Sequence, residues 1–156
     1  MAAGSRATVK ENATRTGQQR RGGEMAGKRI LIVDDDESLV KMLASSLSAE
    51  GFETCEALGG MSAIKSAYAS RPDLIVLDVR MPLVDGFRVV ERLKSSTRTF
   101  RIPILFLSAL PKEDIEEKAL RLGVSCCFAK PFEIAELIDC VHGLLGTELK
   151  RYAVHA

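Results

Sequence analysis

The sequence lacks several features that would place it in a specialised class of protein. It has no apolar run near the roughly 20 residues that a bilayer span requires. No apolar signal-peptide core lies near the N-terminus. The net charge is only +1, so the chain has no overall attraction to nucleic acid or to anionic membranes. These absences exclude a membrane-spanning protein, and we expect a cytoplasmic protein with no membrane association.

Cysteine is also scarce. The four cysteines, Cys55, Cys126, Cys127 and Cys140, lack the spacing of metal ligands and are few for a disulfide scaffold. We therefore expect free thiols, as is usual in the cytosol. The glycine pair at 59–60 has neither the longer glycine-rich loop nor the lysine of a phosphate-binding loop, so it predicts only a turn.

The composition that is present suits one globular domain. The 156 residues are 46% hydrophobic and 28% charged. Residues 1–27 differ, because five basic residues outnumber two acidic ones there and almost no large apolar side chain occurs. Such a segment cannot bury enough surface to offset its ordering entropy. We expect a disordered basic tail over 1–27, a folded domain over 28–146 and a short C-terminal tail over 147–156.

Within the folded domain, short apolar runs alternate with segments whose apolar residues recur at helical spacing. The predicted strands are 29–33, 52–56, 74–77, 102–107 and 126–129. The predicted helices are 38–50, 61–70, 87–95, 112–122 and 133–145. In the first helix, Leu39, Met42, Leu43 and Leu47 are expected to face the core.

The run 74–77 is apolar without alternation, which is typical of a strand buried on both faces of a parallel sheet. The strand 52–56 is less apolar and is predicted to lie at an edge. Alternation of strands and helices indicates βαβ units. The predicted fold class is therefore α/β, with a parallel sheet that helices cover on both faces.

Polar residues occur where four of the predicted strands end. They are Asp34 and Asp35 after the first strand, Asp78 after the third, Ser108 after the fourth and Lys130 after the fifth. The carboxyl ends of parallel strands meet at one edge, where open α/β sheets bind ligands. Neighbouring carboxylates repel each other by ~1 to 4 kcal/mol per close pair. A hard divalent cation with oxygen ligands, such as Mg²⁺, relieves that repulsion, so a metal site is predicted here.

This set of side chains suits phosphoryl transfer. A carboxylate can attack phosphorus and form an aspartyl-phosphate intermediate. Lys130 would stabilise the phosphoryl oxygens as a point charge, and Ser108 would do so as a hydrogen-bond donor. Each of these residues alone is more often a helix cap or part of a surface ion pair. Only the complete set favours a catalytic pocket.

Four segments carry a resemblance to a known family. They are ILIVDDDES, LDVRMPLVDG, the serine in LFLSAL, and AKPF. Together they resemble the receiver domain of two-component response regulators, from Lys28 to about Leu145. The resemblance implies a flavodoxin-like (βα)5 fold, a doubly wound parallel sheet with strand order 2-1-3-4-5, for which a receiver protein is itself a standard example.

The resemblance also implies a role for each residue of the set. Asp78 looks like the phosphoacceptor, Ser108 like the switch hydroxyl and Lys130 like the phosphate-binding lysine. Asp35 would bind Mg²⁺ directly, and Asp34 would help, partly through water. The backbone carbonyl of Arg80 would complete the protein ligands. The Lys130–Pro131 peptide is expected to be cis, as it often is in the family.

The function implied is that of a phosphorylatable signalling switch in a phosphorelay. The phosphoryl group would come from the phosphohistidine of a sensor histidine kinase or a phosphotransfer protein, and slow hydrolysis would reset the signal. With no output domain in the sequence, we expect contact with a downstream output protein, or onward phosphotransfer, and no direct DNA binding. The chain would be a switch that catalyses its own phosphorylation and dephosphorylation rather than a conventional enzyme.

One position departs from the family pattern. An aromatic residue usually stands three residues before the lysine, and here that position holds Cys127. Phe128 is adjacent, but strand alternation sends it to the other face. Signalling through an aromatic switch is therefore not expected.

Two alternatives remain open on the residues alone. The pair Asp34-x-Asp36 after the first strand resembles the nucleophile motif of haloacid-dehalogenase-type phosphatases, with Asp34 as nucleophile. That family's cap domain and its acidic pair after strand five are both missing from the sequence. A phosphorylation-independent binding module is the other alternative, and the complete set of acids, hydroxyl and lysine argues against it.

Overall fold

The five predicted strands form one parallel sheet. The computed structural model describes residues 27–146. The strand order is β2-β1-β3-β4-β5, and the fold is the flavodoxin-like one that was expected. The strands are β1 (Arg29–Val33), β2 (Glu53–Ala57), β3 (Leu74–Asp78), β4 (Ile104–Ser108) and β5 (Cys126–Ala129). The helices are α3 (Glu37–Ala49), α4 (Gly60–Ser70), α5 (Gly86–Lys94), α6 (Lys112–Leu122) and α7 (Ile134–Leu144). Apart from Gly27, the two predicted tails lie outside the described residues.

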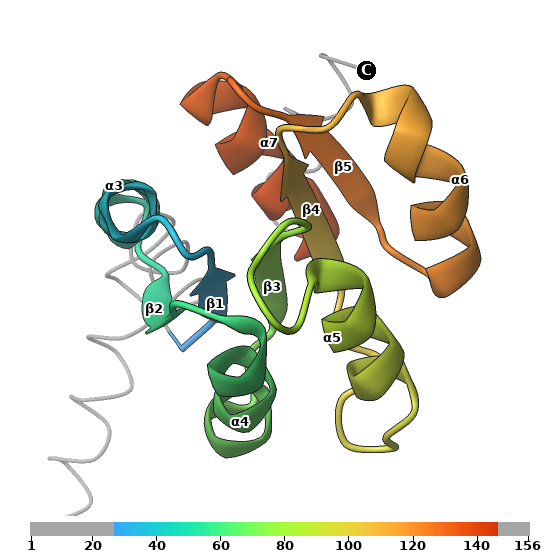
Figure 1. The fold of residues 1–156 in the computed structure, drawn as a ribbon. Helices are drawn as coiled ribbons and strands as arrows, with labels where there is room; N and C mark the ends of the chain where they lie inside the picture. Colours follow the sequence, from blue (N-terminus) through green and yellow to red (C-terminus); the bar gives the residue numbers. More distant parts are fainter. Residues whose placement is uncertain (1–26, 147–156) are drawn as a thin grey trace, which may run out of the picture.

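The helices cover both faces of the sheet, as Figure 1 shows. Helices α3 and α7 lie on one face, and α4, α5 and α6 lie on the other. The middle strands β3 and β4 are therefore buried along their whole length. Strand β2 lies at an edge and buries only Ala57, which confirms the prediction from its composition. Within the described part of the chain, no helix is long and apolar enough to cross a membrane.

Two aspartates begin helices. The Asp36 carboxylate accepts a hydrogen bond from the Leu39 backbone N–H (3.3 Å) at the start of α3. The Asp85 carboxylate accepts one from the Arg88 backbone N–H (3.0 Å) at the start of α5. Aspartate is a preferred N-cap because its side chain satisfies an N–H group that has no partner within the helix. Asp36 is thereby bound to the backbone of α3.

Two sequence predictions about packing and strand limits need correction. Met42 was expected to face the core but is 42% exposed, because it lies about 200° around the helix from the buried Val40. The predicted strand 102–107 begins only at Ile104. Pro103 has no N–H to give to the sheet, so the regular ladder starts after it.

Two glycines allow close packing at the carboxyl edge of the sheet. A Cβ on Gly86 would lie 2.5 Å from the carbonyl oxygen of Asp78. A Cβ on Gly60 would overlap the carbonyl oxygen of Val84. The sequence predicted only a turn at the glycine pair, but Gly60 is the first residue of α4 and packs against the loop that follows β3. Both glycines bring a helix close to the segment that carries Asp78.

We expect Gly86→Ala to lower the free energy of unfolding by about 1–3 kcal/mol, which is typical of overpacking. Alanine favours helix by up to ~1 kcal/mol over glycine, so the expected loss reflects the collision with the β3 backbone. Gly59→Ala is the matched control, because no atom lies within 4 Å of its added Cβ. It should cost at most about 1 kcal/mol, through the weaker N-cap preference of alanine. Urea unfolding measures both; equal stability of Gly86→Ala and the parent would contradict the packing argument.

Candidate functional site

Three carboxylates meet where β1 and β3 end. Asp34 and Asp35 follow β1, and Asp78 is the last residue of β3. The two strands are neighbours in register, with Val33 opposite Leu77. One carboxylate oxygen from each aspartate lies within 4.8 Å of the others. Asp34 and Asp78 are 1% and 4% exposed, whereas Asp35 is open to solvent.

Lys130 brings a positive charge to this cluster from the end of β5. Its Nζ lies 2.7 Å from Oδ2 of Asp34 and 3.4 Å from Oδ1 of Asp78. Burial alone would lower the pKa of Lys130, but the hydrogen bond to Asp34 and the charges of Asp78 and Asp34 outweigh it and raise that pKa. The lysine is therefore a cation held between two buried carboxylates.

The surroundings of Asp78 disfavour the charged form of its carboxyl group. Burial, followed by the negative charge of Asp34, raises the pKa of Asp78 to about 6. The charge of Lys130 and a hydrogen bond from the Arg80 backbone N–H act in the opposite direction without cancelling the effect. Two buried carboxylates share one ammonium group, so the cluster has excess negative charge that a cation would relieve.

Ser108 and Arg80 stand beside the cluster. Ser108 is the last residue of β4, is fully buried, and accepts a hydrogen bond at its Oγ from the Leu110 backbone N–H (3.0 Å). Strand β4 pairs with β3, and Leu107 lies opposite Asp78. The Arg80 backbone N–H faces the Asp78 carboxylate, while its carbonyl remains a metal ligand by prediction only. The four charged residues of the predicted set thus come together, and the hydroxyl lies on the neighbouring strand end.

Two features of the site have no signal in the sequence. Lys130 was expected to serve phosphate, yet its shortest bond is to Asp34, 96 residues earlier in the chain. The backbone N–H of Asp36 also donates to Oδ1 of Asp34 (2.9 Å) and fixes that carboxylate. The Lys130–Pro131 peptide is cis, as expected from the resemblance.

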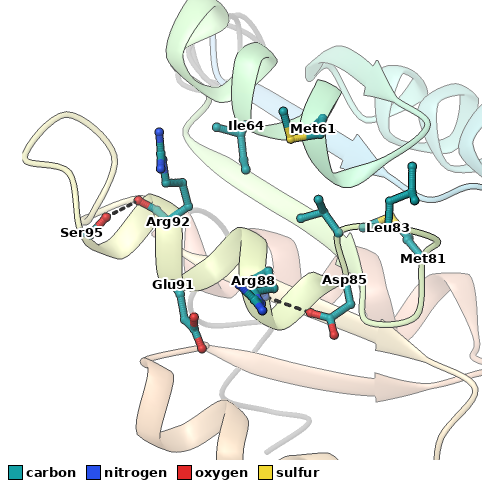
Figure 2. Close-up of a pocket in the computed structure, with 10 residues that line it drawn as sticks. Met61, Ile64, Met81, Leu83, Asp85, Arg88, Glu91, Arg92 and Ser95 are labelled. Atoms are coloured by element: carbon teal, nitrogen blue, oxygen red, sulfur yellow. Dashed lines mark hydrogen bonds between the residues drawn. The ribbon is translucent and has the colours of Figure 1, made fainter.

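The volume of the cavities does not identify the charged cluster as a site. A cavity of about 790 Å³ lies between α4 and α5, and none of the three clustered carboxylates lines it (Figure 2). Its lining comprises Met61, Ile64, Met81, Leu83, Val84, Asp85, Arg88, Glu91, Arg92 and Ser95. A smaller cavity of about 550 Å³ adjoins the loop after β3 and is lined by Arg80 and Leu110 among others. The charged cluster itself lies at the carboxyl edge of the sheet, where β1, β3 and β5 end.

The fold is shared with solved receiver-type proteins. The chain superposes on chemotaxis protein CheY4 of Vibrio cholerae with a TM-score of 0.71 and 27% identity, over 75% of this chain and 98% of that one. It superposes on the receiver domain of the Francisella response regulator 1452 with a TM-score of 0.71 and 28% identity, over 76% and 97%. The class is therefore that of CheY-like α/β proteins.

Sequence comparison is more specific. Residues 30–142 match the response regulator receiver domain. The chain is 39% identical to transcriptional regulatory protein PrrA of Mycobacterium tuberculosis over 117 residues, which are 75% of this chain and 49% of the relative. It is 33% identical to sporulation initiation phosphotransferase F of Bacillus subtilis over 117 residues, 75% of this chain and 93% of the relative. The chain belongs to the response regulator receiver domain family, and it spans about half the length of PrrA.

We expect Asp78→Asn to raise the free energy of unfolding of the metal-free protein by up to about 3 kcal/mol at neutral pH. The pKa of Asp78 is about 6 in the folded protein, against a reference value of 3.8. Folding therefore becomes less favourable as pH rises from about 4 to 6, and the asparagine variant escapes that loss. Below pH 4 the carboxyl is uncharged in both states, so the gain should disappear. Denaturation in EDTA at several pH values measures it.

Asp35→Asn is the control for this prediction, because its carboxylate is exposed and its charge is screened by solvent. Its gain in stability should be smaller than that of Asp78→Asn. A loss of stability in Asp78→Asn at neutral pH would contradict the crowding of charge around Asp78.

Proposed function

We propose that this chain is a phosphorylatable receiver that takes a phosphoryl group from the phosphohistidine of a sensor histidine kinase, or of a phosphotransfer protein, onto Asp78 in the cytoplasm. The meeting of Asp34, Asp35, Asp78 and Lys130 at one edge of the sheet, in a chain of the receiver family, carries this proposal. Family membership favours the signalling function, and nothing in the comparisons supports the phosphatase alternative.

The chemical step uses groups that already lie close together. A carboxylate oxygen of Asp78 attacks phosphorus, a P–O bond forms as the bond from phosphorus to the imidazole nitrogen breaks, and the imidazole takes up a proton. The Nζ of Lys130, 3.4 Å from Oδ1 of Asp78, would donate to a phosphoryl oxygen there. The Ser108 hydroxyl can turn and donate to another, since it has one O–H donor and two acceptor positions. Attack by water on the acyl phosphate would then reset Asp78.

The carboxylates also fit a magnesium ion. Mg²⁺ prefers oxygen ligands and is commonly held by one or two carboxylates together with water and phosphate. We propose that Asp34, Asp35 and Asp78 hold it, with the backbone carbonyl of Arg80 as a further ligand; the three carboxylates lie within 4.8 Å of one another. When bound, the ion would neutralise part of the charge on the phosphoryl oxygens. The exposed carboxylate of Asp35 leaves that side open to a donor.

The output of the switch is proposed to be contact with a downstream output protein. PrrA is named as a transcriptional regulator and is about twice as long as the stretch matched here, so the comparison gives no DNA-binding role to this chain. Onward phosphotransfer is the second candidate. It is favoured by the match to 93% of a relative that is named a phosphotransferase.

Incubation with acetyl phosphate and Mg²⁺ should add one acid-stable, base-labile phosphoryl group, which intact-mass spectrometry detects. Asp78→Asn should abolish the labelling, because it removes the nucleophile. Asp34→Asn should slow labelling by about tenfold or more through weaker metal binding, without abolishing it. Chelation of Mg²⁺ by EDTA should also suppress the labelling.

Peptide mapping after borohydride reduction locates the acyl phosphate. Labelling that persists in Asp78→Asn and disappears in Asp34→Asn would contradict the assignment and indicate the phosphatase-type nucleophile. Glu37→Gln is a neutral control, because this residue is exposed beyond the cap of α3 and pairs with Lys41. It should label like the parent chain.

Phosphorylation should change the conformation of the region from Ser108 to Leu122 more than that of β5. Cys127 packs partly buried in the cluster beneath α6, whereas Phe128 lies on the opposite face with α7. A small thiol neither fills nor vacates the volume of an aromatic ring, so β5 has little to rearrange. Amide chemical shifts with and without beryllofluoride test this. Changes centred on residues 126–128 that vanish in Cys127→Ala, with 108–122 unchanged, would contradict it.

A further inference from the structure

The groove between α4 and α5 has two walls of different chemistry. Its cavity of about 790 Å³ is lined by Met61 and Ile64 from α4 and by Arg88 and Arg92 from α5 (Figure 2). The first two residues are three positions apart and the second two are four apart, so each pair lies on one face of its helix. The groove therefore has an apolar wall on α4 and a cationic wall on α5.

A leucine in the loop after β3 adds a second unusual feature to this groove. Leu83 lines the cavity, its side chain is fully exposed, and its backbone has a φ of 70°. This left-handed conformation is unfavourable for a branched apolar residue and suits asparagine or glycine better. The leucine side chain buries no surface in the described fold. Met61, which is 60% exposed, is a further large apolar side chain on the same groove. Apolar side chains that gather at an exposed surface are typical of a protein interaction site.

The cationic wall is available to an anionic partner. Within residues 27–146, no ion pair includes Arg88 or Arg92. Two acidic residues also line the groove. The carboxylate of Asp85 accepts a hydrogen bond from the Arg88 backbone N–H (3.0 Å) as the cap of α5. Figure 2 shows that the Glu91 side chain points away from α4, whereas the Arg92 side chain points toward it. The two guanidinium groups are therefore open to carboxylates of another molecule.

We propose that this groove binds an amphipathic helix of a partner protein, with apolar side chains along one face of that helix and carboxylates beside them. Apolar side chains spaced three and four residues apart would contact Met61, Ile64 and Leu83, as in other complexes that seat a helix in a groove. The carboxylates would pair with Arg88 and Arg92, whose planar guanidinium groups form bidentate hydrogen bonds with such anions.

The charge of the groove also argues against an occupant from this chain's own N-terminal segment. Residues 1–26 carry five basic and two acidic residues, so the two arginines would repel them. None of Asp34, Asp35 and Asp78 lines the groove, and binding there requires no phosphoryl group. The inference therefore goes beyond the proposed function and does not depend on it.

Selection from a random peptide library tests the chemistry of the occupant. Peptides of about 15 residues, roughly four helical turns, are displayed on phage and selected against the unphosphorylated full chain. We expect the enriched sequences to combine carboxylates with apolar residues at helical spacing. A synthetic peptide from the enriched pool should shift the amide resonances of residues 60–64 and 83–95. Its affinity should fall as added salt screens the charges.

Variants test the two walls separately. Leu83→Asn removes the apolar side chain and keeps a residue that accepts a positive φ. It should weaken binding of the peptide by about tenfold or more, as for a central interface residue, and should unfold at the same urea concentration as the parent or at a higher one. The double variant Arg88→Glu, Arg92→Glu should reverse the charge preference, so that a peptide with lysines in place of its acids binds better than the original.

Matched controls come from α6, on the other side of α5 (Figure 1). Leu120 is 77% exposed and Arg121 is also exposed, and neither lines the groove. Leu120→Asn and Arg121→Gln should bind the peptide like the parent chain.

Four results would overturn the proposal. One is a selection that enriches no peptide, or only peptides without carboxylates. Another is a peptide that binds Leu83→Asn and the double arginine variant as tightly as the parent. The third is a set of amide shifts confined to other surfaces. The last is self-association of the parent chain that Leu83→Asn abolishes, because it would identify a second copy as the occupant.

Discussion

The charged cluster depends on the parallel arrangement of the sheet. Parallel strands bring all their carboxyl ends to one edge, so β1, β3 and β5 deliver Asp34, Asp78 and Lys130 to the same place. Burial there makes each charge depend on the others. Loss of Lys130 would leave two buried carboxylates without their cation, and breaking a buried ion pair in this way commonly costs about 3–5 kcal/mol. Lys130 is therefore expected to stabilise the resting fold.

The elements that position this cluster follow from local patterns in the sequence. Apolar runs bounded by polar residues predict the strands, and their alternation with helices predicts a parallel sheet. Asp34, Asp35 and Asp78 are then predicted to lie at one edge of the sheet, because each stands at the carboxyl end of a predicted parallel strand. The resemblance to receiver domains adds the strand order, and the structure and the comparisons confirm it.

Other features depend on distances between residues that are far apart in the sequence, which a local sequence pattern does not contain. The bond from Lys130 to Asp34 depends on how a flexible side chain crosses the end of the sheet, and the need for glycine at 60 depends on the neighbouring loop. Met42 shows the same limit, since a single residue's phase on a helix is less well determined than the helix itself.

The resting site also contains a route by which a change at Asp78 can reach the surface. A phosphoryl group on Asp78 would add negative charge beside Nζ of Lys130, which is already shared with Asp34, so the cluster would need more hydrogen-bond donors. The buried hydroxyl of Ser108 is the uncharged donor on the next strand end, and its oxygen holds the Leu110 backbone N–H at 3.0 Å. Drawing that hydroxyl toward the phosphate must either move Leu110 or break this bond. Leu110 lies in the loop that leads into α6, so this hydrogen bond connects the Ser108 hydroxyl to that loop.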